Sequence, residues 1–217
     1  MDELVEKLIQ DGYLKTPLII EAFKKIDRRD FVIDEFKDCA YINEPLQIGY
    51  GQTISQPLTV AFMLELLQPI SGEKILDIGS GSGWQTSLLT YCVQPNGKVY
   101  AIERIPELVE FGRKNIAKYN FFEKGIVELI CGDGSKGYAN MVTRPELVEG
   151  FDKIICAASA EEIPQEWKKQ LKIGGRIVAP VKNSIWLIIK KSHLPAGRRG
   201  DDFEEQEFPG FAFVPLV

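Results

Sequence analysis

The sequence predicts an α/β protein with a doubly wound, mostly parallel sheet joined by crossover helices. The first observation is a short apolar run, Ile75 to Ile78, which ends at three glycines spaced two apart and is followed by apolar residues at helical spacing from Trp84 to Val93. The second is another β-rich run, Lys98 to Ile102, which ends on Glu103. The third is a later strand, Glu128 to Ile130, which leads into a glycine-flanked acidic turn.

The glycine turn is typical of the entry to a nucleotide-type cofactor site. Glycine lets the backbone approach a ligand closely, and the free N–H groups at the start of the following helix face that ligand. Glu103 stands about twenty residues after the last glycine, where an acidic side chain usually holds a ribose hydroxyl pair. The glycines fall as Gly79-x-Gly81-x-Gly83, with Trp84 where the dinucleotide fingerprint G-x-G-x-x-G needs its last glycine. A nicotinamide cofactor is therefore disfavoured, and a turn that serves geometry alone is the remaining alternative.

Composition bounds the class of protein. With 217 residues and 45% hydrophobic content, the chain is large enough for one globular domain with a full core and a small N-terminal addition. Its net charge of −5 provides no basic field for phosphates, so we expect no nucleic-acid partner. The sequence shows no long apolar run and no signal-peptide pattern. We therefore expect a cytoplasmic protein with no membrane partner.

Histidine and cysteine usage narrows the chemistry. His193 is the only histidine, and it lies in a segment rich in proline, glycine and arginine. Neither a Ser-His-Asp triad nor a zinc site with several imidazoles is expected, and we predict no metal. The four cysteines are scattered with no C-x-x-C pair, which is typical of reduced cysteines in a core.

The N-terminal stretch Asp2 to Asp30 predicts two helices. Apolar residues share a face on each side of a break at Leu14 to Pro17. The second helix is expected to begin near Thr16, a good N-cap, with Pro17 in its first turn. This addition forms either a lid or substrate wall, or two helices that only pack against the rest.

The stretch Asp38 to Pro57 predicts an ordered loop. It contains glycines, prolines and small polar residues without the charge of a disordered segment, and loops of that length usually carry function. A helix is predicted from Pro57, which places Ser55 just ahead of a helix N-terminus. From the local sequence, Ser55 is either the N-cap of that helix or a functional side chain.

The remaining elements complete the sheet. Strands are predicted at Phe151 to Ala157 and Gly175 to Pro180, a helix at Ile163 to Leu171, and a terminal antiparallel pair that starts with Trp186 to Lys190. Two polar stretches, 139–150 and 192–202, look like insertions at loop tips. The prolines and glycines of the second stretch favour an extended surface loop over a strand.

Several stretches resemble one protein family. The pattern Asp77-x-Gly79-x-Gly81-x-Gly83 resembles motif I of class I S-adenosylmethionine-dependent methyltransferases. The run Gly49 to Pro57 (Gly-Tyr-Gly-Gln-Thr-Ile-Ser-Gln-Pro) resembles the signature loop of protein-L-isoaspartate O-methyltransferases. Further matches, in family order, are Asp27–Val32, Gly132–Gly134 with Gly137–Tyr138, Gln170–Arg176 with Pro180–Val181, and Phe213–Leu216. Together these matches cover nearly the whole chain.

The resemblance implies a seven-stranded, Rossmann-like methyltransferase sheet with a helical N-terminal addition and an antiparallel C-terminal hairpin. Residues 1–57 would supply the N-terminal helices and a substrate and cofactor loop, and residues 58–217 the methyltransferase domain, together one compact unit. The implied cofactor is S-adenosyl-L-methionine. The implied partners are damaged proteins and peptides that carry isoaspartyl residues, and a monomer is expected.

The implied activity is protein repair by methyl transfer from S-adenosylmethionine to the free α-carboxylate of an L-isoaspartyl residue. Such a carboxylate has a pKa of about 3.3–3.7 and is already ionised, so the reaction needs alignment and exclusion of water but no general base. One alternative is a methyltransferase that acts on a different carboxylate or on a small molecule. Another is a binding protein that has kept the fold and lost turnover.

The resemblance also assigns roles to residues of this sequence. Ser55 is expected to be the catalytic residue that orients the acceptor carboxylate. The Asp133 carboxylate is placed to accept from an adenine amino group, with a solvated turn aspartate as the alternative. Val214, Pro215 and Leu216 are expected to join Ser55 in binding the substrate. The residues expected to bind the cofactor are Gln52, Thr53, Ile54, Asp77, Gly79, Ser80, Gly81, Gly83, Glu103, Arg104, Gly132, Asp133 and Gly134.

Overall fold

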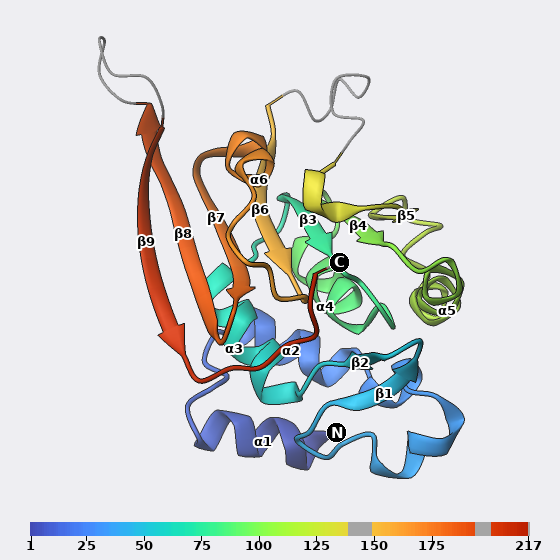
Figure 1. Cartoon of the computed structure of the whole chain (residues 1–217). Helices are drawn as coiled ribbons and strands as arrows, with labels where there is room; N and C mark the ends of the chain where they lie inside the picture. The colour runs from blue at the N-terminus through green and yellow to red at the C-terminus, as the bar shows by residue number, and fades with distance from the viewer. Residues whose placement is uncertain (139–148, 194–200, 217) are drawn as a thin grey trace.

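The computed structural model describes residues 1–138, 149–193 and 201–216, and its centre is a seven-stranded sheet (Figure 1). The strand order is β5-β4-β3-β6-β7-β8-β9. Neighbouring strands from β5 to β7 are parallel, whereas β8 and β9 are each antiparallel to the preceding strand. The predicted doubly wound, mostly parallel sheet with an antiparallel C-terminal pair is confirmed. The strand bounds are β3 Lys74–Ile78, β4 Lys98–Glu103, β5 Val127–Cys131, β6 Phe151–Cys156, β7 Leu171–Val181, β8 Ser184–His193 and β9 Asp201–Pro209.

The strand order changes direction at β3. The chain runs outward from β3 to β4 and β5, and then returns to the other side of β3 as β6. Leu76 of β3 accordingly pairs with Tyr100 of β4 on one side and with Ile154 of β6 on the other. In open α/β sheets, ligands bind in the crevice outside the carboxyl ends of the strands at such a switch point. The fold therefore places a ligand site at the ends of β3, β4 and β6.

Side chains that alternate along the strands pack into two hydrophobic cores, one on each face of the sheet. Ile75 and Val99 belong to the larger core, which also takes side chains from the N-terminal helices and from α3 to α5. Leu76, Tyr100 and Trp167 belong to the smaller core on the opposite face, which α6 covers. Within the described ranges, no helix is both long and apolar enough to span a membrane. The helix bounds are α1 Asp2–Gln10, α2 Pro17–Lys25, α3 Pro57–Leu67, α4 Trp84–Val93, α5 Pro106–Ala117 and α6 Gln165–Gln170.

The N-terminal addition lies below the carboxyl ends of the parallel strands in Figure 1. The two predicted helices are confirmed as α1 and α2, and two short 3-10 helices follow, η1 Arg28–Phe31 and η2 Asp34–Cys39. The next segment is not wholly the predicted loop, because β1 Leu46–Gly49 and β2 Gln52–Ile54 form an antiparallel hairpin.

The hairpin turns at a Gly-Tyr-Gly sequence that adopts three successive positive φ angles. These are 92° at Gly49, 55° at Tyr50 and 71° at Gly51. Two glycines make this turn accessible, because most other residues avoid positive φ. Leu46 of β1 and Ile54 of β2 are paired, and both side chains are buried. The hairpin is therefore held by apolar packing as well as by strand pairing.

The C-terminal boundaries differ from the predictions in two places. Helix α6 ends at Gln170 because the backbone of Leu171 is extended, with φ −87° and ψ 132°, and β7 begins at Leu171, earlier than the predicted Gly175. β8 continues to His193 and β9 begins at Asp201, so the ends of the stretch 192–202 are strand and not loop. Residues 139–148 of the other predicted insertion lie outside the described residues.

The start of α2 is held by a side chain from α3. Thr16 is the N-cap residue and Pro17 begins the helix, as predicted, but the Thr16 side chain accepts no N–H group of α2. Glu65 Oε1 accepts the N–H groups of Lys15 and Thr16, each at 2.8 Å, and Glu65 Oε2 accepts the Thr16 hydroxyl at 2.7 Å. Glu65 thus connects the N-terminal helices to α3, which packs on the central sheet.

We predict that Glu65→Ala lowers the free energy of unfolding by about 1–3 kcal/mol, because two backbone N–H groups and a hydroxyl lose a half-buried charged acceptor. Urea unfolding followed by circular dichroism measures the change. Glu6→Ala, at an exposed position of α1, is the control and is expected to change stability by less than about 0.5 kcal/mol. Equal effects of the two substitutions would contradict the role of Glu65.

Candidate active site

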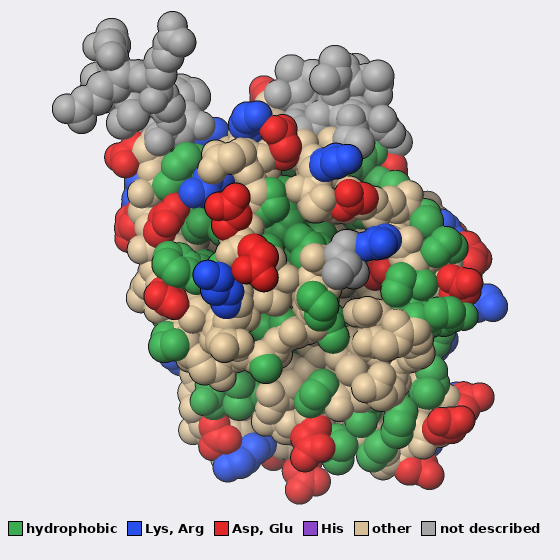
Figure 2. All heavy atoms as spheres, viewed as in Figure 1, with side chains coloured by type: hydrophobic (Ala, Val, Ile, Leu, Met, Phe, Trp, Pro, Cys, Tyr) green, Lys and Arg blue, Asp and Glu red, His purple; other side chains and the backbone are tan. Residues whose placement is uncertain are grey.

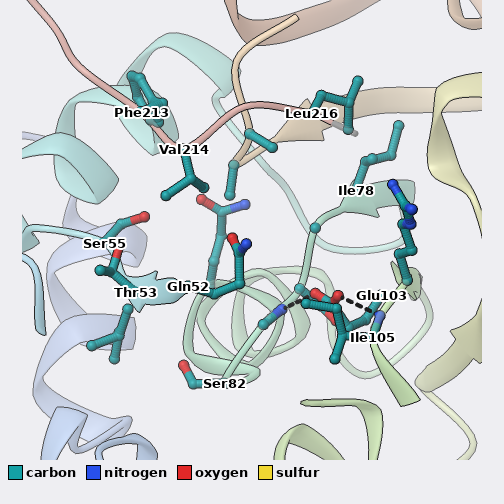
Figure 3. A pocket seen from close by; sticks show the side chains of 18 of the residues that line it. Gln52, Thr53, Ser55, Ile78, Ser82, Glu103, Ile105, Phe213, Val214 and Leu216 are labelled. Carbon is teal, nitrogen blue, oxygen red and sulfur yellow. Dashed lines mark hydrogen bonds between the residues drawn. The ribbon is translucent and has the colours of Figure 1, made fainter. Parts of the chain in front are cut away.

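A cavity of about 570 Å³ opens at the carboxyl ends of β3, β4 and β6, within the usual range of about 300–1,000 Å³ for small-molecule sites. Figure 2 shows this face hollowed near its centre, with mostly hydrophobic and uncharged groups around the hollow. In the close-up, Ser55 and Thr53 lie on one side, Glu103 on the other, and Val214 and Leu216 come from the C-terminal tail (Figure 3). The cavity therefore brings together the glycine turn, the β1–β2 hairpin and the tail.

The predicted glycine turn follows β3. Gly79, Gly81 and Gly83 have φ angles of 77°, 49° and 86°, which favour glycine. Gly79 and Gly81 line the cavity, together with Ser80. Gly83 is outside the lining, and a Cβ there would stand 2.8 Å from Ile116 Cγ1. Gly83 therefore permits close packing of α4 on α5, and this predicted cofactor residue does not reach the cavity.

Asp77 lies behind the glycine turn and outside the cavity lining. It is fully buried, on the sheet face that α4 covers, and its Oδ1 accepts from Gln85 Nε2 at 2.8 Å while its Oδ2 accepts from Thr86 Oγ1 at 2.6 Å. Burial raises the pKa of Asp77 to about 6, although the two hydrogen bonds favour the ionised form. The predicted direct contact of Asp77 with a cofactor is thus not supported by its position: the side chain anchors the start of α4.

Glu103 stands at the cavity wall at the end of β4. Its side chain is 7% exposed, its Oε2 accepts the N–H of Gly81 at 2.8 Å, and its Oε1 accepts the N–H of Ile105 at 2.9 Å (Figure 3). Each carboxylate oxygen has a second lone pair that can accept a further donor. Glu103 therefore fixes the turn and keeps acceptor capacity toward the cavity.

The acidic turn after β5 forms a third part of the wall. Gly132, Asp133 and Gly134 line the cavity, as does the exposed Arg104. Asp133 Oδ1 accepts the N–H of Ser135 at 2.9 Å. Hydrogen bonding to the Ser135 side chain, and then to this N–H group, lowers the pKa of Asp133 below its ordinary value. The carboxylate is thus ionised at neutral pH and held at the edge of the cavity.

Ser55 lies half-buried in the cavity lining, next to Gln52, Thr53 and Ile54. Helix α3 begins at Pro57, and its N-cap residue is Gln56, so the N-cap interpretation of Ser55 is wrong. The carbonyl oxygen of Ser55 accepts from Arg28 Nη2 at 3.2 Å. Within the described part of the chain, the Ser55 hydroxyl makes no hydrogen bond, so it can serve a ligand.

The C-terminal tail closes the cavity above Ser55. The N–H of Ser159 donates to the Val214 carbonyl, and the N–H of Leu216 donates to the Ser159 carbonyl, both at 2.7 Å. These two bonds hold the tail against the segment that follows β6. Val214, Pro215 and Leu216 all line the cavity, where the predictions placed a substrate wall.

Several lining residues were not predicted from the sequence. One of them is Trp84, whose buried Nε1 has no partner within the described residues; the Oγ of Ser80, a predicted residue, is likewise buried without a partner there. Trp84 and Gln85 directly follow the last glycine, so their place at the start of a helix was the available signal. The other unpredicted lining residues include Tyr50 and Phe213, which lie inside the matched stretches Gly49–Pro57 and Phe213–Leu216, and Ile105, which no local pattern marks.

Comparison with solved structures identifies the fold. A crystal structure from Plasmodium falciparum, described as a protein-L-isoaspartate O-methyltransferase in complex with S-adenosyl-L-homocysteine, superposes with a TM-score of 0.82. The two chains are 23% identical, and the match covers 99% of this chain and 97% of the other. This likeness shows the fold: the protein has the Rossmann-like fold of S-adenosylmethionine-dependent methyltransferases.

Sequence comparison identifies the family. The profile of the family "Protein-L-isoaspartate(D-aspartate) O-methyltransferase (PCMT)" matches residues 1–217. The protein-L-isoaspartate O-methyltransferase of Methanopyrus kandleri is 39% identical over 220 residues, which cover 100% of this chain and 90% of that protein. The protein of the same name from Aeropyrum pernix is 41% identical over 217 residues, 99% of this chain and 78% of that protein. The chain belongs to the protein-L-isoaspartate O-methyltransferase family.

We predict a pH-dependent stability contribution from Asp77. An aspartate in the unfolded chain ionises near pH 4, whereas Asp77 in the folded protein ionises near pH 6, so the folded state binds more protons in between and loses stability as the pH rises. The unfolding free energy of the wild type, minus that of Asp77→Asn, is expected to fall by at most about 3 kcal/mol from pH 4 to pH 6 and then to level off. Urea titrations from pH 4 to pH 7 measure this difference, and a constant difference would contradict the assignment.

Proposed function

We propose that this protein transfers a methyl group from S-adenosyl-L-methionine to the free α-carboxylate of an L-isoaspartyl residue in a damaged protein. The observation that carries the proposal is the joining of two half-sites in one cavity. The wall formed by the glycine turn and Glu103 suits a nucleoside, and Ser55 with the C-terminal tail forms a second wall for an acceptor. The match of the family profile along the whole chain supports the choice of acceptor.

The residues present fit S-adenosylmethionine. The Glu103 carboxylate keeps lone pairs for the ribose hydroxyls, and Asp133 with the neighbouring backbone suits the adenine ring. Ser80 Oγ and Trp84 Nε1 are buried polar atoms without partners in the described chain, and a bound polar ligand would satisfy them. When bound, S-adenosylmethionine supplies an electrophilic methyl group on a sulfonium.

On the acceptor side, the role proposed for Ser55 is to orient the carboxylate through its free hydroxyl. Val214 to Leu216 would exclude water from the acceptor and provide main-chain recognition, since the tail runs extended along the cavity. An ionised carboxylate is already a nucleophile, so this chain has to align its oxygen with the methyl group and need not remove a proton. This assignment agrees with a cavity lining that contains no histidine.

We further propose that the protein acts as a monomer in the cytoplasm. One chain supplies both walls of the cavity, so a second copy is not needed to complete it. All four cysteines are free thiols, as suits a reducing compartment.

We predict that Glu103→Gln weakens binding of S-adenosyl-L-homocysteine by about 10- to 100-fold. The reason is that the amide keeps only one of the two acceptor oxygens of the carboxylate and replaces the other with an NH₂ donor. Isothermal titration calorimetry measures the dissociation constant. Glu107→Gln, an exposed change on α5, is the matched control and is expected to leave the constant unchanged. Unaltered binding in Glu103→Gln would remove Glu103 from the cofactor site.

We predict methyl transfer from labelled S-adenosylmethionine to an isoaspartyl peptide and none to the same peptide with normal aspartate at that position. Ser55→Ala is expected to lower kcat/KM about 100-fold, the usual effect of losing one hydrogen-bond donor to a reacting oxygen, with cofactor binding intact. Ser71→Ala, an exposed serine that bonds only the Gln94 carbonyl, is the control. Tight cofactor binding without label on either peptide would point to a different acceptor.

A further inference from the structure

Arg28 is a fully buried charged side chain at the start of η1. Its Nη1 donates to the carbonyl oxygens of Ala40 at 2.6 Å and Ile42 at 3.2 Å. Its Nη2 donates to the carbonyl oxygens of Glu44 at 2.9 Å and Ser55 at 3.2 Å. The first three carbonyls precede β1 and the fourth follows β2, so a single guanidinium ties the two ends of the hairpin segment together.

The same guanidinium also contacts the helix that follows the glycine turn. Its Cζ stands 5.3 Å from the ring centroid of Trp84, the first residue of α4 after the glycine turn. Trp84 lines the cavity, and Phe23 of α2 packs against it edge to face at 5.6 Å. Arg28 is therefore located between the backbone of Ser55 and α4, the helix that begins at the glycine turn.

The charge of Arg28 is retained at a considerable cost in solvation. Burial lowers the pKa of Arg28 to about 10, so the side chain is still charged at neutral pH. Its partners in the described chain are carbonyl dipoles and the Trp84 ring. Apolar residues of similar volume often stabilise a core as well as a buried ionic group does, so a buried charge is weak support for stability alone. A planar group with several donors is, however, well suited to fixing several carbonyls in one arrangement.

We infer that Arg28 is a positioning residue of the active site: by holding the Ser55 carbonyl and the segment before β1, it sets the place of the Ser55 hydroxyl relative to the glycine turn. This inference rests on the proposed function, in which Ser55 orients the acceptor carboxylate. Displacement of a positioned group by about 1 Å can reduce the rate about 100-fold, so the loss of these bonds should lower turnover without removing the cofactor site.

The test compares Arg28→Met, which removes the charge and all donors, with Arg28→Lys, which keeps the charge but loses the planar fork. For the isoaspartyl peptide, kcat/KM is expected to fall about 100-fold in Arg28→Met and about 10-fold in Arg28→Lys. The dissociation constant of S-adenosyl-L-homocysteine is expected to change less than about threefold in both. If Arg28→Met does not fold, Arg28→Lys alone decides the inference.

A second measurement, amide hydrogen exchange, does not require a peptide substrate. Amide hydrogen exchange of residues 43–55 is expected to rise about tenfold or more in Arg28→Lys, while exchange in residues 79–83 stays at the wild-type rate. Glu65→Ala is the matched control, because it also removes a half-buried charged group with several hydrogen bonds but leaves the Arg28 contacts intact. It should lower stability without changing exchange in 43–55 or kcat/KM.

The outcomes separate the inference from the proposed function. Unchanged exchange in residues 43–55 of Arg28→Lys would overturn the inference, as would a loss of cofactor binding in proportion to activity. A wild-type protein that transfers no methyl group to the isoaspartyl peptide would contradict the proposed function alone, since the exchange measurement would still decide whether Arg28 positions the Ser55 segment.

Discussion

The arrangement of the active site depends on the satisfaction of backbone N–H groups at the carboxyl end of the sheet. A strand that turns into a helix leaves such groups without partners. Here the N–H groups of Gly79 and Ser80 both donate to the Ile102 carbonyl, and that of Gly81 donates to the Glu103 carboxylate. The turn after β3 is therefore tied to β4 at three consecutive residues. Because Glu103 also accepts from Ile105, the same carboxylate fixes the path into α5. These hydrogen bonds fix the path of the turn without the help of a ligand.

The two halves of the cavity have different structural origins. The wall proposed to bind the cofactor is formed by the ends of parallel strands, so the sheet itself creates it at the switch point between β3 and its neighbours. The wall proposed for the acceptor comes from two other segments, the β1–β2 hairpin and the tail at Val214 to Leu216. Neither segment belongs to the central sheet, and each is held by a few specific bonds, to Arg28 in one case and to Ser159 in the other. Acceptor geometry can thus change without rebuilding the fold.

The sequence predicted most of the sheet, because buried parallel strands are continuous apolar runs that end at glycine or acidic residues. The predictions that failed, or that the sequence could not decide, concern the hairpin, the N-cap of α3 and the orientation of Asp77. The hairpin was missed because its turn, Gly49-Tyr50-Gly51, has positive φ angles and therefore requires glycines. These glycines made the amino-acid composition of the whole segment typical of a loop. The N-cap alternative for Ser55 could not be decided locally, because the choice between Ser55 and Gln56 depends on where Pro57 starts α3. Asp77 belongs to the motif, yet whether it faces a ligand or α4 follows from the alternation of the buried strand, which places it on the α4 side.

The polar groups around the cavity are used to place atoms and not to move protons. Asp77 has a pKa raised to about 6, in a range useful to an acid or base, but it lies outside the cavity lining and its oxygens are taken by Gln85 and Thr86. Glu103 binds backbone N–H groups, and Arg28 binds backbone carbonyls. On the wall proposed for the acceptor, the hydroxyl of Ser55 has no hydrogen-bond partner in the described chain, and neither has that of the neighbouring Thr53. A site built in this way suits a reaction between an ionised acceptor and a charged methyl donor, in which the barrier is lowered by alignment and dehydration, since neither partner has a proton to lose.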